Sequence, residues 1–141
     1  MKCCTFFGHA DAPAEIIPEL KEIIQYCIKK HAVDTFYVGE QGNFDRYARQ
    51  IIKEIQQEQS EITYYVVLSY LPKKTADFST ENTIYPEGLE MVPRRFAIDK
   101  RNRWMIDHSD FVITYVSRSF GGAAKFKEIA EKKNRVVINI T

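Results

Sequence analysis

The sequence has neither a long hydrophobic run nor an excess of charge of one sign. No apolar segment approaches the roughly 20 residues that a transmembrane helix needs. Met1-Lys2-Cys3-Cys4 is not followed by the apolar region of a secretory signal. The 20 basic and 19 acidic residues leave a net charge of +1. This balance argues against membrane binding and against bulk binding of nucleic acid through charge. We therefore expect a cytoplasmic protein.

Cysteine is scarce, and its spacing suits neither a disulfide framework nor a metal site. The three cysteines, Cys3, Cys4 and Cys27, include no CxxC pair. Adjacent cysteines rarely bond each other in a strand, because successive side chains point to opposite faces. The histidines fall in separate predicted elements without ligand spacing: His9, His31 and His108. We expect free cysteines in a reducing compartment, no metal site and no cofactor.

The glycine motifs of the commonest nucleotide-binding loops are also missing. The six glycines form neither the Gly-Lys-Ser/Thr of a P-loop nor the GxGxxG of a dinucleotide-binding fold. No GxSxG marks an activated serine. A ligand site therefore has to be argued from where the glycines lie in the fold.

The sequence does have a regular alternation of apolar runs and amphipathic segments. Its 141 residues, 45% of them hydrophobic, suit one domain that buries roughly two thirds of its unfolded surface. Short apolar runs predict strands at 3–7, 35–38, 62–71, 111–116 and 136–140. Apolar residues at three-and-four spacing predict a first helix that Asp11 caps and that ends near His31. The same spacing predicts further helices at 44–57, 94–108 and 122–133.

This order predicts an α/β fold over residues 1–141. We expect a single Rossmann-like three-layer domain, with a mainly parallel five-stranded sheet and helices on both faces. The expected strand order is 3-2-1-4-5. Residues 71–93 show no periodicity and contain three prolines. A loop of that length is typical of a functional lid.

Glycine-bearing loops follow three of the predicted strands. They read Gly8-His9-Ala10-Asp11, Gly39-Glu40-Gln41-Gly42-Asn43, and Ser117 to Gly122. Ligands bind beyond the carboxyl ends of parallel strands, where the strand order reverses, so we expect these loops to form one crevice. Gly121-Gly122 opens the last helix, where free N–H groups and the positive end of the helix dipole favour a phosphate.

Side chains near this crevice can supply further contacts. Arg101 suits bidentate binding of phosphate or carboxylate. His9 either contacts phosphate or a base, or caps the following helix. Asp45 either supports the helix dipole or accepts a hydrogen bond from a ribose hydroxyl. The predicted ligand-binding residues are Gly8, His9, Gly39, Glu40, Gln41, Asp45, Arg101, Asn102, Ser117, Ser119, Gly121, Gly122 and Lys125.

The chain resembles the SLOG (SMF/DprA–LOG) superfamily over nearly its whole length and, within it, the small bacterial YpsA-like branch. The matching segments are Phe6-Phe7-Gly8-His9, Phe36-Tyr37-Val38-Gly39, Gln41-Gly42, Phe44-Asp45, Arg101-Asn102-Arg103-Trp104-Met105, Ser109-Asp110 and Gly121-Gly122-Ala123-Ala124. The resemblance implies a Rossmann-like fold that binds a nucleotide or a nucleotide-derived molecule such as ADP-ribose. Since members commonly form dimers, it also implies a homodimer or higher homo-oligomer.

The superfamily includes the LOG phosphoribohydrolases, which split a nucleoside monophosphate into base and ribose phosphate. By resemblance, Arg101 and Glu128 fall on their catalytic residues. The loop departs from the LOG pattern PGGxGTxxE, because Phe120, Ala124 and Lys125 replace its proline, its later glycine and its threonine. In addition, Ala10 stands where the YpsA-like branch usually has arginine after the Gly-His pair.

These departures favour binding over hydrolysis. The main hypothesis is a sensor or regulatory protein that binds a nucleotide at the carboxyl ends of the strands. One alternative is a LOG-like nucleoside 5'-monophosphate phosphoribohydrolase, in which Glu128 acts on the ribose and Arg101 positions it. Another is a regulator that acts through a protein partner contacted by residues 71–93.

Overall fold

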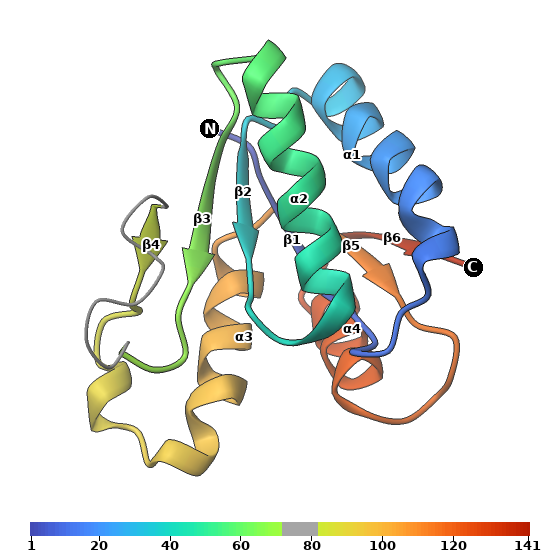
Figure 1. The fold of residues 1–141 in the computed structure, drawn as a ribbon. Coiled ribbons are helices and arrows are strands. Elements are labelled where there is room, and N and C mark those ends of the chain that lie inside the picture. Colours follow the sequence, from blue (N-terminus) through green and yellow to red (C-terminus); the bar gives the residue numbers. More distant parts are fainter. Residues whose placement is uncertain (72–81) are drawn as a thin grey trace.

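A parallel sheet lies between two layers of helices. The fold is seen in a computed structural model, which describes residues 1–71 and 82–141 (Figure 1). The strands are β1 (Cys3–Gly8), β2 (Thr35–Val38), β3 (Thr63–Val67), β4 (Thr83–Ile84), β5 (Phe111–Tyr115) and β6 (Val136–Ile140). The α-helices are α1 (Ile17–His31), α2 (Gly42–Glu58), α3 (Ala97–Asp107) and α4 (Gly122–Lys132). Three short 3-10 helices are η1 (Ala14–Ile16), η2 (Leu89–Met91) and η3 (Arg94–Phe96).

Within residues 1–71 and 82–141, the sheet has six strands in the order β4-β3-β2-β1-β5-β6, and every neighbouring pair is parallel. The prediction of five strands omitted one strand, β4, which falls in the segment 71–93. Two residues are too few to show an alternating pattern, and β4 exists through its pairing with Val66 and Val67 of β3. The predicted order of the other five strands is confirmed.

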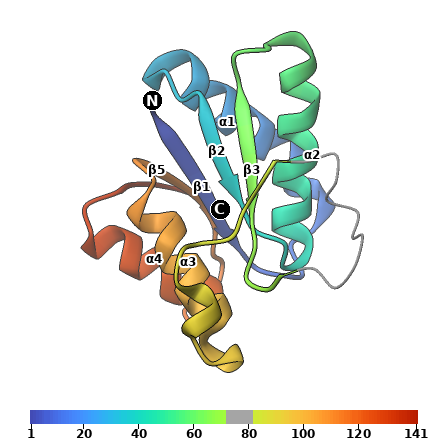
Figure 2. The same cartoon turned by 90° about the vertical axis from the view of Figure 1, so that its left-hand side faces the viewer.

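Helices α1 and α2 cover one face of the sheet, and α3 and α4 cover the other (Figure 2). Phe6 of β1 packs in the core on the α1–α2 side, whereas its neighbour Phe7 packs in the core on the α3–α4 side. Alternate residues of a strand point to opposite faces, so a strand covered on both sides has to be apolar throughout. This explains the short continuous apolar runs of the sequence.

Several predicted boundaries were too generous. β3 ends at Val67 instead of residue 71, and α3 starts only after the 3-10 turn at Arg94–Phe96. The predicted cap at Asp11 is also wrong, because η1 precedes α1 and no side chain caps either helix. The Asp11 carboxylate instead accepts a hydrogen bond from the Arg118 guanidinium at 3.3 Å.

The register of the central strands brings their carboxyl ends to one edge. Gly8, the last residue of β1, lies opposite Tyr115, the last residue of β5. The loops after these two strands therefore begin side by side. Of the segment 71–93, residues 72–81 lie outside the described part, and the remainder contains β4 and η2. Among the described helices, none is long and apolar enough to cross a membrane.

Candidate functional site

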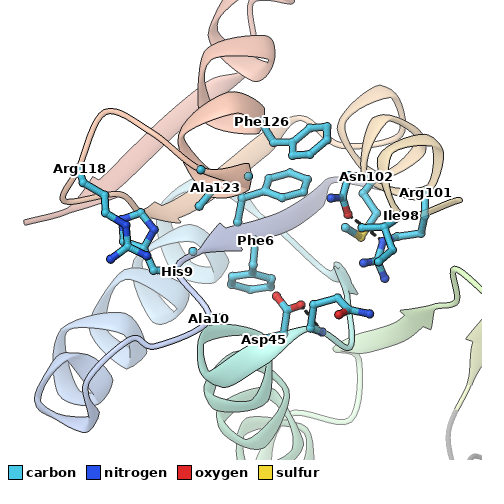
Figure 3. A pocket seen from close by; sticks show the side chains of 16 residues that line it. Phe6, His9, Ala10, Asp45, Ile98, Arg101, Asn102, Arg118, Ala123 and Phe126 are labelled. Atoms are coloured by element: carbon cyan, nitrogen blue, oxygen red, sulfur yellow. Dashed lines mark hydrogen bonds between the residues drawn. The ribbon is translucent and has the colours of Figure 1, made fainter. Parts of the chain in front are cut away.

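A cavity of about 320 Å³ opens at the carboxyl ends of the strands (Figure 3). Its walls come from the end of β1, the β2–α2 loop with the start of α2, one face of α3, and the β5–α4 loop with the start of α4. The predicted ligand-binding residues that line it are Gly8, His9, Gln41, Asp45, Arg101, Asn102, Gly121 and Gly122. The structure therefore brings together all three of the glycine-bearing loops at one hollow.

The remaining predicted residues lie around the cavity and not in its lining. Gly39 and Glu40 border a separate small hollow with Gly42, and Ser119 borders another on the outer side of α4. Ser117 contributes its backbone N–H to a hydrogen bond with His9. The Lys125 ammonium pairs with Asp99 of α3 at 2.6 Å, so a phosphate would have to compete with that carboxylate.

Glu128, the second residue that the LOG resemblance implies for catalysis, lies outside the cavity. Its side chain is 65% exposed on α4 and pairs with Lys132 one turn later, at 3.0 Å. It borders the hollow that contains Ser119. Arg101 lines the cavity, so the structure separates the two residues that the resemblance joins.

His9 is held as a neutral ring at the end of β1. It is 4% exposed, and the Ser117 N–H donates a hydrogen bond to its Nε2 at 3.0 Å. A nitrogen that accepts cannot carry a proton, so the ring hydrogen is on Nδ1. Burial, followed by the positive charge of Arg118, lowers the pKa of His9, while Asp11 opposes the shift. The ring accepts its hydrogen bond from the β5–α4 loop and does not cap α1. Of the two predicted roles, capping is therefore wrong, and contact with phosphate or a base stays a prediction.

Arg118, which is not among the residues predicted from the sequence although it stands between Ser117 and Ser119, lines the cavity. Figure 3 shows its guanidinium beside the His9 ring. Its partner Asp11 is 73% exposed, and the Arg118 guanidinium lowers the pKa of that carboxyl through its hydrogen bond and its charge. The signal that could have identified Arg118 was its position: it is the one cation in the loop that follows β5.

The first turn of α4 faces the same end of the cavity. Its N-cap residue Gly121 has φ 96° and ψ 175°, and no side chain caps the helix. The N–H groups of a first helical turn have no partner within the helix. Gly121, Gly122 and Ala123 all line the cavity. We call Arg118, His9 and this first turn the anion end.

The opposite part of the cavity, which we call the acid end, is built around Arg101 and Asp45. Arg101 is only 1% exposed; its Nη1 donates to the Val67 carbonyl at 2.8 Å and its Nε to Asn102 Oδ1 at 2.8 Å. Asp45 Oδ2 accepts the backbone N–H of Gln41 at 2.9 Å. These contacts fix the side chains of both charged residues before any ligand enters.

Gly39 lets the two charges of the acid end approach each other. A Cβ at this position would lie 2.7 Å from Asp45 Oδ2 and 3.2 Å from Arg101 Nη1. Any larger residue at position 39 would therefore push the carboxylate or the guanidinium away. Gly39 thus supports the site without lining the cavity, because its lack of a side chain leaves space for these two groups.

Burial dominates the ionisation of Asp45. Removal from water raises the pKa of its carboxyl to about 6, against the opposing effects of the Gln41 N–H and of Arg101 and Arg49. Glu40 adds a smaller effect that also raises the pKa. The carboxyl is therefore mainly ionised at neutral pH, but it stays close to the point of taking up a proton.

An apolar wall completes the cavity on the α3 and α4 side. Ile98 and Met105 contribute from α3, and Phe126, whose ring stacks on Phe7 with centroids 5.5 Å apart, contributes from α4. On α3, residues 98, 101, 102 and 105 follow three-and-four spacing and so share one face of the helix. That spacing could have grouped the apolar wall with Arg101 from the sequence. Within residues 1–71 and 82–141, no group of three His, Cys, Asp or Glu side chains could hold a metal ion.

Comparisons with known proteins bear on the fold. A scan of protein-family models finds no match to the chain, and neither does a search of curated proteins. Among solved structures, the chain is similar to the X-ray structure of DNA processing protein A (DprA) from Streptococcus pneumoniae, with a TM-score of 0.71 and 16% sequence identity. The match covers 100% of this chain and 50% of that chain, so this chain spans about half the length of its structural neighbour. At this identity the likeness shows the fold alone, and that fold agrees with the Rossmann-like fold expected from the sequence.

Proposed function

We propose that this chain binds a nucleotide or a nucleotide-derived molecule in the cavity and acts as a sensor or regulatory protein. The observation that carries the proposal is the composition of the anion end. A guanidinium, a neutral imidazole and the uncapped first turn of an eleven-residue helix face one end of a single cavity. Each of the three can donate hydrogen bonds to a phosphate.

Arg118 supports this proposal because it is available to a ligand. Its ion pair with Asp11 is exposed to solvent, and such pairs contribute little to stability. A phosphate at the α4 terminus can therefore compete for the guanidinium. Arg118 also reaches the neighbourhood of His9, so it can supply the positive charge that Ala10 lacks in comparison with the YpsA-like pattern.

The size and lining of the cavity favour a mononucleotide over a dinucleotide. About 320 Å³ lies near the lower end of the roughly 300–1,000 Å³ that small-molecule sites span. Ile98, Met105 and Phe126 offer an apolar wall against which a base can pack. A ligand with one charged end and one flat apolar face suits this arrangement.

Binding without hydrolysis is the version that the positions of the acidic residues support. By the LOG resemblance, the carboxylate that acts on the ribose is Glu128, and Glu128 is exposed, outside the cavity lining and paired with Lys132. Among the described residues that line the cavity, Asp45 is the only acid. Asp45 is held by the Gln41 N–H at the acid end.

A thermal-shift screen of the purified chain tests the proposal. The panel contains nucleoside monophosphates, ADP, ATP, NAD, ADP-ribose and cyclic nucleotides, and mass spectrometry follows the fate of each ligand. A ligand that binds only the folded chain raises Tm in a concentration-dependent way, and we expect this from a mononucleotide that stays intact. Release of a free base would contradict the sensor role in favour of hydrolysis. No shift with any nucleotide at saturation would overturn the proposal.

A further inference from the structure

We propose that Asp45 selects the uncharged part of the ligand, by accepting hydrogen bonds from a pair of adjacent donors on it. Two parts of a nucleotide carry such a pair: the 2',3'-hydroxyls of ribose, and the N1–H and amino group of guanine. This inference deepens the proposed function and rests on it. Figure 3 shows Asp45 in the cavity on the side away from Arg118, where a phosphate held at the anion end would leave the rest of the ligand.

Asp45 has hydrogen-bonding capacity to spare. An ionised carboxylate offers about four lone-pair sites. Within the described residues, the one hydrogen bond that its side chain accepts comes from the Gln41 N–H, at 2.9 Å. Among the described residues, the hydrogen bonds that the nearby Arg101 side chain donates go to the Val67 carbonyl and to Asn102, and none goes to Asp45. Asp45 as a whole is only 9% exposed, so water satisfies its carboxylate poorly.

Asn102, which also lines the cavity, determines which hydrogen-bonding groups the acid end offers besides Asp45. Arg101 Nε donates to Asn102 Oδ1, so the NH₂ of the same amide is left to donate hydrogen bonds into the cavity. Figure 3 shows this nitrogen on the cavity side. The acid end thus combines one negative acceptor, Asp45, with two donors, the Arg101 guanidinium and the Asn102 amide. A ligand group that only accepts would be repelled where it meets the carboxylate.

Two adjacent donors match a buried carboxylate better than one. A buried charge that gains no partner is costly, whereas a hydrogen bond to a charged group is worth roughly 1.5–3 kcal/mol. A ribose diol and a guanine edge each present two donors side by side. Adenine and cytosine present one amino group next to a ring nitrogen that itself accepts, and a dideoxyribose presents none. The difference in affinity between these ligands therefore measures whether Asp45 accepts hydrogen bonds from a pair of donors.

Calorimetric titration of wild type and Asp45→Asn with GMP, AMP and their 2',3'-dideoxy forms tests the assignment. Asparagine keeps the shape of Asp45 and an oxygen for the Gln41 N–H, but it loses the charge and one acceptor. We expect wild type to prefer the donor-bearing ligand by about 10- to 100-fold, and Asp45→Asn to reduce that preference to near unity. If the ribose diol is the source, the ratio of ribose to dideoxy affinity collapses; if guanine is the source, the ratio of GMP to AMP affinity collapses.

Matched measurements separate the possible failures. Asp107→Asn removes an equal charge from the far end of α3, where Asp107 pairs with Lys133, and should leave both ratios as in wild type. Thermal unfolding without ligand checks that Asp45→Asn is folded. Binding by wild type with ratios near unity, or with ratios that Asp45→Asn leaves unchanged, overturns the assignment alone. No binding of any of these nucleotides by wild type, together with no Tm shift across the nucleotide panel, overturns the proposed function and, with it, this inference.

Discussion

At the residue scale, the cavity rests on two buried charges of opposite sign. Arg101 and Asp45 approach each other above Gly39, and neither could remain ionised there without the hydrogen bonds that hold them. Burial lowers the pKa of Arg101 while Asp45 and Glu40 oppose that shift. Burial raises the pKa of Asp45 for the same physical reason, since it disfavours whichever form is charged.

The raised pKa of Asp45 makes stability depend on pH in a defined direction. Between the ordinary value of 3.8 and about 6, the folded chain keeps a proton that the unfolded chain releases. The stability from this proton is complete below 3.8 and is lost as the pH rises through about 6. We expect Asp45→Asn, which cannot ionise, to be more stable than wild type at pH 7, by on the order of 2 kcal/mol. The gain should shrink toward pH 4.

Urea unfolding of the two proteins across this range measures the difference in free energy of unfolding. Arg101 and Arg49 attract the ionised carboxylate, and Glu40 repels it, so the measured curve reports the balance of all these groups. Asp107→Asn serves as the control for exchanging an exposed aspartate. A difference between wild type and Asp45→Asn that stays constant from pH 4 to pH 7 would show that Asp45 is not desolvated as described.

From the sequence, chain position was enough to predict which residues gather at the carboxyl ends of the strands, and their binding of a ligand stays a prediction. His9, Gln41, Gly121 and Gly122 follow directly from glycine loops at strand ends, and all of them line the cavity. Arg118 did not follow, because its approach to His9 depends on the pairing of β1 with β5, which brings Gly8 opposite Tyr115. Such a register is a tertiary property that a local pattern does not contain.

At the element scale, long periodic segments were predictable and short ones were not. The four α-helices and five of the strands follow from apolar spacing. β4 does not, because two residues cannot display a period. The predicted helix at 94–108 included the 3-10 turn of η3, because cationic residues run through both η3 and α3. The predicted lid at 71–93 lies partly outside the described residues. Its described part contributes to a separate hollow beside Ser69 and not to the cavity.

The start of α4 depends on the backbone of Gly121. Its φ of 96° and ψ of 175° fall in a region that is essentially restricted to glycine, and a Cβ there would meet nothing within 4 Å. Gly121→Ala should therefore lower the free energy of unfolding by about 1–3 kcal/mol through backbone strain alone. It should also weaken phosphate-bearing ligands, because the first-turn N–H groups of α4 would turn away from the anion end.

Gly122→Ala is the matched control for this change. Position 122 is the first residue of α4, lacks the positive φ and has open space around a Cβ. Alanine at a compatible position should leave stability unchanged or raise it by up to about 1 kcal/mol. Chemical unfolding of both variants makes the comparison of stability, and ligand titration of Gly121→Ala against wild type measures the loss of phosphate affinity. Equal effects of the two substitutions would contradict the role given to the Gly121 backbone.

At the scale of the whole molecule, the chain is a helix-covered sheet with a cavity at one edge. The six parallel strands deliver their carboxyl ends to the same side, and the cavity opens between the loops that follow β1, β2 and β5. The solved structure of DNA processing protein A has this fold in about half of its length. The YpsA-like branch and the homodimer stay predictions of the resemblance.

The proposed function places the phosphate of the ligand between Arg118 and the first turn of α4. Calorimetry with the nucleoside monophosphate that most raises Tm, and with its unphosphorylated nucleoside, tests it in three proteins: wild type, Arg118→Gln and Arg103→Gln. Arg103 is a suitable control because it is a half-exposed arginine that pairs with Asp99 on α3, outside the cavity lining. We predict that Arg118→Gln weakens the monophosphate by about 10- to 100-fold and the nucleoside by less than about twofold, with Arg103→Gln like wild type. Equal affinity of wild type for the two ligands, or equal losses in the two variants, would contradict the account.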